Sequence, residues 1–391
     1  MQPAEHRTIQ LARRLVLTLG LVSFFADATY EGARSITGPF LGVLGASAAT
    51  ISLIAGCGEL VGYALRGVSG YLSDRTSRYW LWIWLGYSVN LLSVPLLAAA
   101  PNWEVAAVLI VSERLGKALR TPARDVLLAS AGRFLGYGRA FGLHELLDQI
   151  GAVLGPLLVA AVLSRGGEYR SSFIALLVPA VLALIALLPA RITPTLRSES
   201  SQARTVFRIR TLSRQFWLYI IAMALTAAGT ADFALIAFHL QATSAIPSAW
   251  IPLSYALAMG IDALAALILG RMYDRVGLRL LPAAVGIATV AAPLVFLSPF
   301  PAALAGLVLW SISIGLQESI ARAALTNFVA PEWHGTAYGI FHAIFGISWF
   351  LGSAAMGLLY TCSPALLVTF AITTYSVACL LLYLLAKGRQ M

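Results

Sequence analysis

Charged residues are scarce in this chain. Asp, Glu, Lys and Arg together make up 11% of its 391 residues, whereas 59% are hydrophobic and the mean hydropathy is +0.82. A water-soluble domain of this length needs far more charge to cover its surface. The apolar residues are grouped in stretches of about 20, the length of a helix that crosses a bilayer. The composition therefore excludes a soluble fold and predicts an all-α membrane protein.

Cysteine and histidine are also rare. The three cysteines, Cys57, Cys362 and Cys379, lie inside apolar stretches at spacings that match neither a disulfide framework nor a zinc site. The five histidines form no H-x-x-x-x-D or H-E-x-x-H pattern, and the chain has no G-x-x-x-x-G-K phosphate-binding loop. We therefore expect no catalytic residues, no metal site, no cofactor, no enzyme activity and no direct use of ATP.

Twelve apolar stretches follow one another along the chain. The predicted spans are 15–37, 47–72, 79–100, 104–126, 138–163, 171–190, 214–240, 249–271, 279–299, 301–327, 335–361 and 364–386. Basic residues are concentrated in alternate links, and the other links hold almost only Arg165 and Arg170. Because positively charged links stay in the cytoplasm, this pattern predicts that both termini and the central link are cytoplasmic. The first span follows three arginines without a clear cleavage site, so we expect it to be retained.

The longest polar segment lies near the middle of the chain. The stretch from Arg191 to Arg214 contains six arginines, Pro194 and a serine-rich patch at 198–201. We predict an N-terminal six-helix bundle at 1–190, a cytoplasmic linker at 191–213 and a C-terminal six-helix bundle at 214–391. An amphipathic helix lying on anionic lipid explains Val206 to Arg214 equally well.

The two halves contain matching motifs. A G-x-x-x-D-R element between spans two and three recurs 200 residues later, between spans eight and nine. Its residues are Gly70, Asp74, Arg75 and Arg78 in the first copy and Gly270, Asp274, Arg275 and Arg279 in the second. A further match pairs the start of span five (139–142) with the start of span eleven (336–339). Parallel six-span repeats place a binding site at their interface, and rocking of the halves alternates access to it.

On these residues the chain resembles the major facilitator superfamily over essentially its whole length. The resemblance implies twelve helices in two pseudo-symmetric bundles, and secondary active transport in the cytoplasmic (inner) membrane of a prokaryote. It implies that Asp74 belongs to a cytoplasmic charge relay with Arg120 or Arg124 of span four. We expect Gly70 to permit close helix approach. A topogenic turn without a gating role explains the same arginines.

Span five contains a second element of this kind. Gly151, Gly155 and Pro156 resemble the glycine-proline element of proton-coupled exporters in the superfamily, which favours export. Helix packing and a proline kink explain these residues nearly as well. Span four departs from the exporters, and the chain resembles prokaryotic drug/proton-antiporter-like members without matching their span-four motif.

Ionisable residues inside the spans are the candidate proton-coupling and cavity residues, because membrane charges normally face a bundle interior or an aqueous cavity. Asp27, Glu31 and Arg34 share one face of span one, where two neighbouring carboxylates favour the retention of a proton. A static ion-pair cluster that fixes helix packing is the alternative. The other candidates are Glu59, Glu113, Arg114, Lys117, Glu145, Asp148, Asp232 and His239.

The spacing of these residues separates structural from coupling roles. Glu113 and Lys117 have the spacing of an intrahelical ion pair. Asp232 and His239 are seven residues apart in span seven, like Asp27 and Arg34 in span one, so we expect each pair to share a helix face. The preferred coupling residues, which lack an obvious intrahelical partner, are Asp27, Glu31, Asp148 and Asp232.

Several functions agree with this sequence. The leading hypothesis is outward transport of a small organic solute, driven by the proton gradient. The alternatives are uptake of an anionic metabolite held by Arg34, Arg114 or Lys117, export of a divalent metal, and a sensor that does not transport. We expect a small-molecule substrate, protons and membrane lipid as partners, and no nucleic acid. A monomer is expected because one chain contains a complete cavity.

Overall fold

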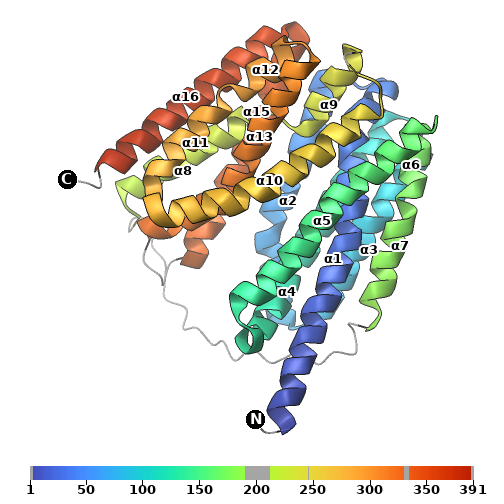
Figure 1. Ribbon diagram of the computed structural model, residues 1–391, viewed down its shortest axis with the longest axis vertical. Helices are drawn as coiled ribbons and strands as arrows, with labels where there is room; N and C mark the ends of the chain where they lie inside the picture. Colours follow the sequence, from blue (N-terminus) through green and yellow to red (C-terminus); the bar gives the residue numbers. More distant parts are fainter. Residues whose placement is uncertain (1–2, 190–211, 245, 330–333, 389–391) are drawn as a thin grey trace. The chain divides into compact units, whose positions relative to one another are not determined.

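The computed structural model describes residues 3–189, 212–244, 246–329 and 334–388. The predicted linker at 191–213 lies almost entirely outside these residues. All regular secondary structure in the described part is helical (Figure 1). The elements of the first half are α1 (Pro3–Val43), α2 (Ala48–Thr76), α3 (Tyr79–Leu96), η1 (Leu97–Ala99), α4 (Trp103–Leu135), α5 (Tyr137–Ser164), α6 (Tyr169–Ala175) and α7 (Leu177–Leu187).

The second half contains more helix breaks. Its elements are α8 (Arg214–Gly229), α9 (Phe233–Ala242), α10 (Trp250–Val276), η4 (Gly277–Arg279), α11 (Leu280–Ala288), α12 (Ala291–Leu297), α13 (Phe300–Gly315), the π-helix η5 (Leu316–Ile320), α14 (Ala321–Leu325), η6 (Thr326–Phe328), α15 (His334–Cys362) and α16 (Pro364–Gly388). Each of the twelve predicted spans corresponds to one helix or to a run of consecutive helices. The prediction of an all-α, twelve-span protein is confirmed.

Nine helical segments of the described residues are long and apolar enough to cross a membrane. One of them, 250–297, contains two predicted spans, because α10 is followed by the turn at η4 and by α11 and α12. The α4 helix is not among the nine, since six charged residues lie between positions 113 and 125. The α13 helix is shorter than the others and continues through η5 and α14.

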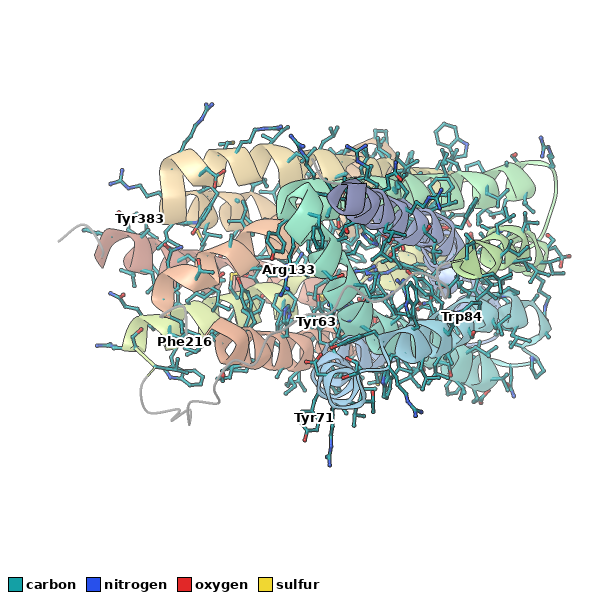
Figure 2. The ribbon with its side chains drawn as sticks, turned by 90° about the horizontal axis from the view of Figure 1, so that it is seen from below. Tyr63, Tyr71, Trp84, Arg133, Phe216 and Tyr383 are labelled. Carbon is teal, nitrogen blue, oxygen red and sulfur yellow. The ribbon has the colours of Figure 1, made fainter. Side chains whose placement is uncertain are left out.

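The α3 helix shows how the bilayer reverses the usual pattern of burial. Its buried face carries the polar side chains of Tyr87, Asn90 and Ser93. Its exposed face is a stripe of leucines at positions 81, 85, 92 and 96, all at least 46% exposed. Tyr71 at the end of α2 also points away from the helices (Figure 2) and is 53% exposed. The chain therefore presents apolar residues to lipid and keeps polar residues inside.

Local sequence signals fix several helix ends. Asn102 caps α4, because its side-chain oxygen accepts a hydrogen bond from the amide of Val105 at 3.0 Å. Gly136 connects α4 to α5 with a φ of 90°, a conformation that favours glycine. Arg170 in α6 donates hydrogen bonds to the carbonyls of Ala98, at 2.6 Å, and Ala100, at 2.8 Å, and so caps the end of η1.

The chain packs as two compact units. Unit 1 comprises residues 1–36 and 64–204, and unit 2 comprises residues 37–63 and 205–391. Residues 37–63 are the end of α1, the start of α2 and their connection. The predicted bundles follow the covalent order of the chain, whereas the packing assigns this hairpin to unit 2.

Each unit contains a matching helix crossing made by glycine. In unit 1, a Cβ atom at Gly151 or Gly155 of α5 would collide with the backbone of Phe24 or Ala28 of α1. In unit 2, a Cβ atom at Gly352 of α15 would collide with the backbone of Ala228 in α8. Spans one and five therefore cross in the same way as spans seven and eleven. This agreement supports the pseudo-symmetry predicted from the repeated motifs.

Candidate functional site

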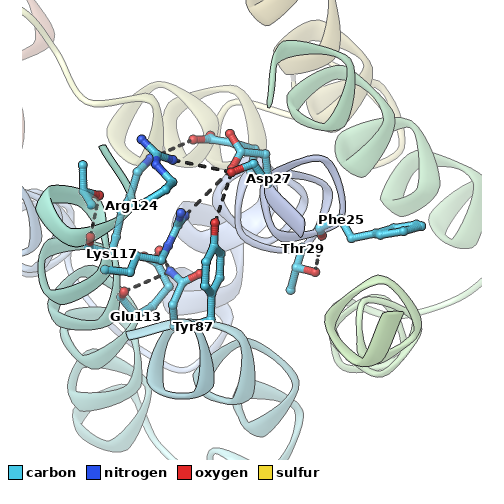
Figure 3. Close-up of polar contacts among 12 residues, drawn as sticks. Phe25, Asp27, Thr29, Tyr87, Glu113, Lys117 and Arg124 are labelled. Carbon is cyan, nitrogen blue, oxygen red and sulfur yellow. Dashed lines mark hydrogen bonds and ion pairs between the residues drawn. The ribbon is translucent and has the colours of Figure 1, made fainter. Parts of the chain in front are cut away.

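Unit 1 contains a buried cluster of charges between α1 and α4 (Figure 3). Asp27 and Glu31 of α1 are 5% and 6% exposed. Arg120 of α4 is fully buried, with Nη2 4.0 Å from Oδ1 of Asp27. Lys117 Nζ lies 3.9 Å from Oε1 of Glu31, and Arg34 Nη1 lies 3.8 Å from the same oxygen. Each carboxylate of α1 is therefore paired with a cation of α4.

Two tyrosines line this cluster. The guanidinium carbon of Arg120 lies 4.2 Å from the ring centroid of Tyr87 and 5.8 Å from that of Tyr30. Lys117 Nζ lies 4.2 Å from the centroid of Tyr30. None of the three guanidinium nitrogens of Arg120 has a hydrogen-bond partner among the described residues. Cation–π attraction and the charge of Asp27 thus hold a guanidinium whose N–H groups are not used.

Glu113 contacts Asn90 of α3 and the adjacent Arg114. Asn90 donates hydrogen bonds to the backbone oxygen of Glu113 at 3.0 Å and to Oε1 at 2.7 Å. Arg114 Nε lies 3.3 Å from Oε2 of Glu113. The predicted intrahelical pair between Glu113 and Lys117 is therefore wrong. Lys117 pairs instead with Glu31, because α1 lies beside this face of α4.

The cluster continues toward α5. The hydroxyl of Ser23 forms hydrogen bonds with the hydroxyl of Tyr87, at 3.1 Å, and with Nε2 of His144, at 2.9 Å. Arg124 binds Oδ1 of Asp125 through Nε, at 3.1 Å, and through Nη2, at 3.0 Å. Arg120 and Arg124 of α4 and His144 of α5 thus lie around the same interior of unit 1.

One group in the described residues has spacing compatible with a metal ion. Ligand atoms of His144, Glu145 and Asp148 lie within 4.8 Å of one another. Glu145 is exposed, and Asp148 lies within electrostatic range of Arg124 and Lys117. These cations disfavour a divalent ion at the same place. The group is better described as part of the charged interior of unit 1.

Asp232 and His239 lie at the two ends of α9, and both contact α15. The break between α8 and α9 leaves Asp232 at the N-terminal end of α9, and its carboxylate accepts hydrogen bonds from Trp349, at 2.9 Å, and Ser353. His239 Nδ1 lies 2.9 Å from the hydroxyl of Tyr360. Both residues therefore face α15 through partners that are also seven residues apart, as expected for residues that share a face. Each residue contacts α15 at a different level.

Two other candidates belong to unit 2. Glu59 is half-buried on the part of α2 that belongs to unit 2. His239 lines a cavity of about 490 Å³ in unit 2, with Phe296, Phe300 and Ser363 among its walls. The structure therefore groups Asp27, Glu31, Arg34, Lys117 and Asp148 within unit 1, whereas Glu59, Asp232 and His239 belong to unit 2.

The repeated G-x-x-x-D-R elements are exposed in both copies. Asp74 accepts a hydrogen bond from the hydroxyl of Tyr79 at 3.2 Å. Its predicted relay partners, Arg120 and Arg124, bind Asp27 and Asp125 instead, so that prediction is wrong. The other acidic and basic residues of the two elements, Arg75, Arg78, Asp274, Arg275 and Arg279, are also exposed.

The glycines of these elements do not mark a close helix crossing. A Cβ atom at Gly70 would meet Pro122 at 3.4 Å, which is ordinary contact. A Cβ atom at Gly270 would have no described atom within 4 Å. The expected close approach is found instead at Gly151 and Gly155 of α5. The buried Pro156 follows directly, so the geometry gives the glycine-proline element a packing role against α1.

The sequence matches the Major Facilitator Superfamily over residues 19–353. The chain belongs to this superfamily, and it is an integral, multi-pass membrane transporter rather than an enzyme. An uncharacterised protein of Mycobacterium tuberculosis is 38% identical over 388 residues, covering 97% of this chain and 94% of the relative. An uncharacterised transporter of the superfamily from Methanocaldococcus jannaschii is 24% identical over 374 residues, covering 93% and 92% of the two chains.

Solved structures share the fold. A variant of the nucleoside transporter NupG superposes with a TM-score of 0.75 at 16% identity, covering 95% of this chain and 98% of that one. A bacterial homologue of the human lysosomal transporter Spinster, in an inward-facing and occupied conformation, gives a TM-score of 0.75 at 16% identity, covering 99% and 98%. These similarities confirm the predicted fold.

Tyr87 and Asn90 were not predicted as site residues, and Arg120 was predicted only as a partner of Asp74. A signal for Arg120 was present, because Lys117, Arg120 and Arg124 are spaced three and four residues apart and share one face of α4. Such a cationic face inside a membrane span requires an anionic partner. Tyr87 carries no comparable signal, since aromatic residues are common in membrane spans.

Proposed function

We propose that this chain is a proton-coupled secondary transporter that moves a small organic solute outward across the cytoplasmic membrane by alternating access. The observation that carries the proposal is the pairing of Asp27 with Arg120 and of Glu31 with Lys117, across α1 and α4. All four side chains are largely removed from water. A proton bound by Asp27 removes its attraction for Arg120 and so weakens one link between the two helices.

The superfamily, the span-five element and the distribution of basic residues support the remaining parts of this proposal. Membership of the superfamily supports a small-molecule substrate and alternating access. The glycine-proline element of span five resembles that of exporters and supports the outward direction. The alternation of basic links supports cytoplasmic termini. A functional monomer surrounded by membrane lipid follows from a chain that already contains both repeats.

Uptake of an organic anion is a second candidate, and one observation favours it. Arg120 is fully buried, and its guanidinium nitrogens have no hydrogen-bond partner among the described residues. A proton on Asp27 would leave this guanidinium available to a carboxylate of the solute, which it can bind through two N–H groups. Proton and anion would then bind together and move in the same direction.

The two candidates are separated by proton movement in liposomes. Purified protein is reconstituted with a pH-sensitive dye inside, and a panel of organic cations and anions is added on one side. Export by exchange moves protons against the solute, whereas anion uptake moves both together. Asp27→Asn and Glu31→Gln are expected to abolish proton flux while solute binding remains. Glu104→Gln changes an exposed carboxylate at the start of α4 and serves as the control.

A result without proton flux for every solute would contradict proton coupling. Equal flux in the parent and in both α1 variants would show that the charge cluster only stabilises the fold. Binding of organic anions that is lost in Arg120→Gln would favour the second candidate. The direction of net proton movement decides between exchange and joint transport for any solute that moves.

A further inference from the structure

The hairpin formed by the end of α1 and the start of α2 packs closely on unit 2. Along α2 and α15, glycines of one helix lie against side chains of the other over about three turns of helix. A Cβ atom added to the glycine of each pair would approach the partner side chain to 2.9 Å or less, so no larger residue fits without movement. The pairs are Gly56 with Ser353, Gly357 with Ser52, and Gly346 with Tyr63.

The end of α1 packs on α9 in the same manner. A Cβ atom at Gly38 would collide with the backbone of Ala234, and one at Gly42 would meet the ring of Phe238 at 2.9 Å. The α9 and α15 helices therefore form one platform under residues 37–63. Close contact of this kind depends on the correct register between the two helices of the platform.

Asp232 connects these two helices. It precedes the first residue of α9, and its side chain makes no capping hydrogen bond to the described residues of that helix. The carboxylate is directed instead to α15, where Oδ1 accepts from Trp349 Nε1 at 2.9 Å and Oδ2 accepts from the hydroxyl of Ser353. Ser353 is the residue that lies against Gly56. One carboxylate thus fixes the part of α15 on which α2 packs.

We propose that Asp232 is a positioning residue for alternating access, which holds α15 in register against residues 37–63. This inference rests on the alternating access of the proposed function and not on proton coupling at Asp27. It assigns to Asp232 a hydrogen-bonding role in place of the proton-carrying role predicted from the sequence. Separation of the hairpin from the platform is then easier when the carboxylate is removed.

A cysteine at position 52 can report this separation. Ser52 is 1% exposed, and its hydroxyl has no hydrogen-bond partner among the described residues, so Ser52→Cys changes little. The background carries Cys57→Ala, Cys362→Ala and Cys379→Ala. The rate of reaction with a charged, membrane-impermeant thiosulfonate is measured in proteoliposomes without solute and without a pH gradient. The assay therefore gives a result whether or not the chain couples protons.

The two substitutions at Asp232 have different expected effects. Asp232→Ala removes both acceptors and should raise the reaction rate about tenfold, the factor that one hydrogen bond to a charged group contributes. Asp232→Asn should stay within about twofold of the parent, because the amide oxygen accepts from Trp349 and the amide nitrogen donates to Ser353. Asp262→Ala removes another buried carboxylate of unit 2, on α10, and should leave the rate unchanged.

Three outcomes would overturn the inference. The first is an unchanged rate in Asp232→Ala. The second is an equal increase in Asp262→Ala, which indicates general loosening of unit 2. The third is an increase in Asp232→Asn as large as that in Asp232→Ala, which indicates that the charge matters and the geometry does not. If Asp232→Ala fails to fold, Ser353→Ala removes one donor from α15 and must raise the rate in its place.

Discussion

The pair formed by Asp27 and Arg120 offers a quantitative test of the unit 1 cluster. The two side chains are 7% and 1% exposed, and their charged atoms are 4.0 Å apart. At this distance and an effective dielectric constant of about 20, the attraction is about 4 kcal/mol. Removal of one partner leaves a buried charge without compensation, which costs about 3–5 kcal/mol. Removal of both partners costs much less, because neither charge is left alone.

A double-mutant cycle measures this difference. The free energy of unfolding is determined in detergent for the parent, Asp27→Asn, Arg120→Gln and the double variant. We expect each single variant to be destabilised and the double variant to recover about 1–3 kcal/mol relative to the sum. Arg34→Gln is the control, because its guanidinium is 26% exposed and Glu31 keeps Lys117 as a partner. Additive single effects would refute an energetic link between α1 and α4 at this pair.

Three further predictions concern the packing of unit 1. Gly155→Ala should lower the free energy of unfolding by about 1–3 kcal/mol through collision with α1. In the control Gly142→Ala, the added Cβ atom has no described atom within 4 Å, so this change should be neutral or stabilising. Both are measured by denaturant unfolding, and equal effects would contradict the close contact between α5 and α1. Arg170→Met should lower the free energy of unfolding by about 2 kcal/mol through loss of two hydrogen bonds, and so lower the midpoint of thermal unfolding. Arg165→Met, at an exposed position, is its control. Tyr87→Phe should retain the ring beside Arg120 and be milder than Tyr87→Leu in the same assay. Both variants lose the hydroxyl that contacts Ser23, so equal destabilisation would show that the ring contributes nothing.

Hydropathy predicted the spans well because the bilayer demands long apolar helices. It could not predict the break between α8 and α9, where the residues after Gly229 remain apolar apart from Thr230 and Asp232. Packing against α15 supplies partners for Asp232 that local sequence does not reveal. The position of Asp232 in its helix therefore depends on tertiary structure.

Spacing along one helix did not identify the charge partners of Glu113 and Lys117. Glu113 and Lys117 have suitable spacing, yet each binds a different residue, since α1 and α3 bring Glu31 and Asn90 against the two faces of α4. Side-chain ridges of one helix pack into the grooves of its neighbour, and this packing determines which charged residues meet. The same reason explains the wrong partner for Asp74, because Arg120 and Arg124 point into the interior of unit 1.

Arg170 interrupts the alternation of basic links that predicts the orientation of the chain. Its guanidinium is bound to two backbone carbonyls at the end of η1, so its position is required by the folded structure. In the predicted orientation this link crosses the membrane during insertion, and before these carbonyls are in place the same charge opposes that step. Orientation during biosynthesis and stability after folding thus place contrary demands on one residue. An Arg170→Met chain should insert more uniformly and yet unfold more readily.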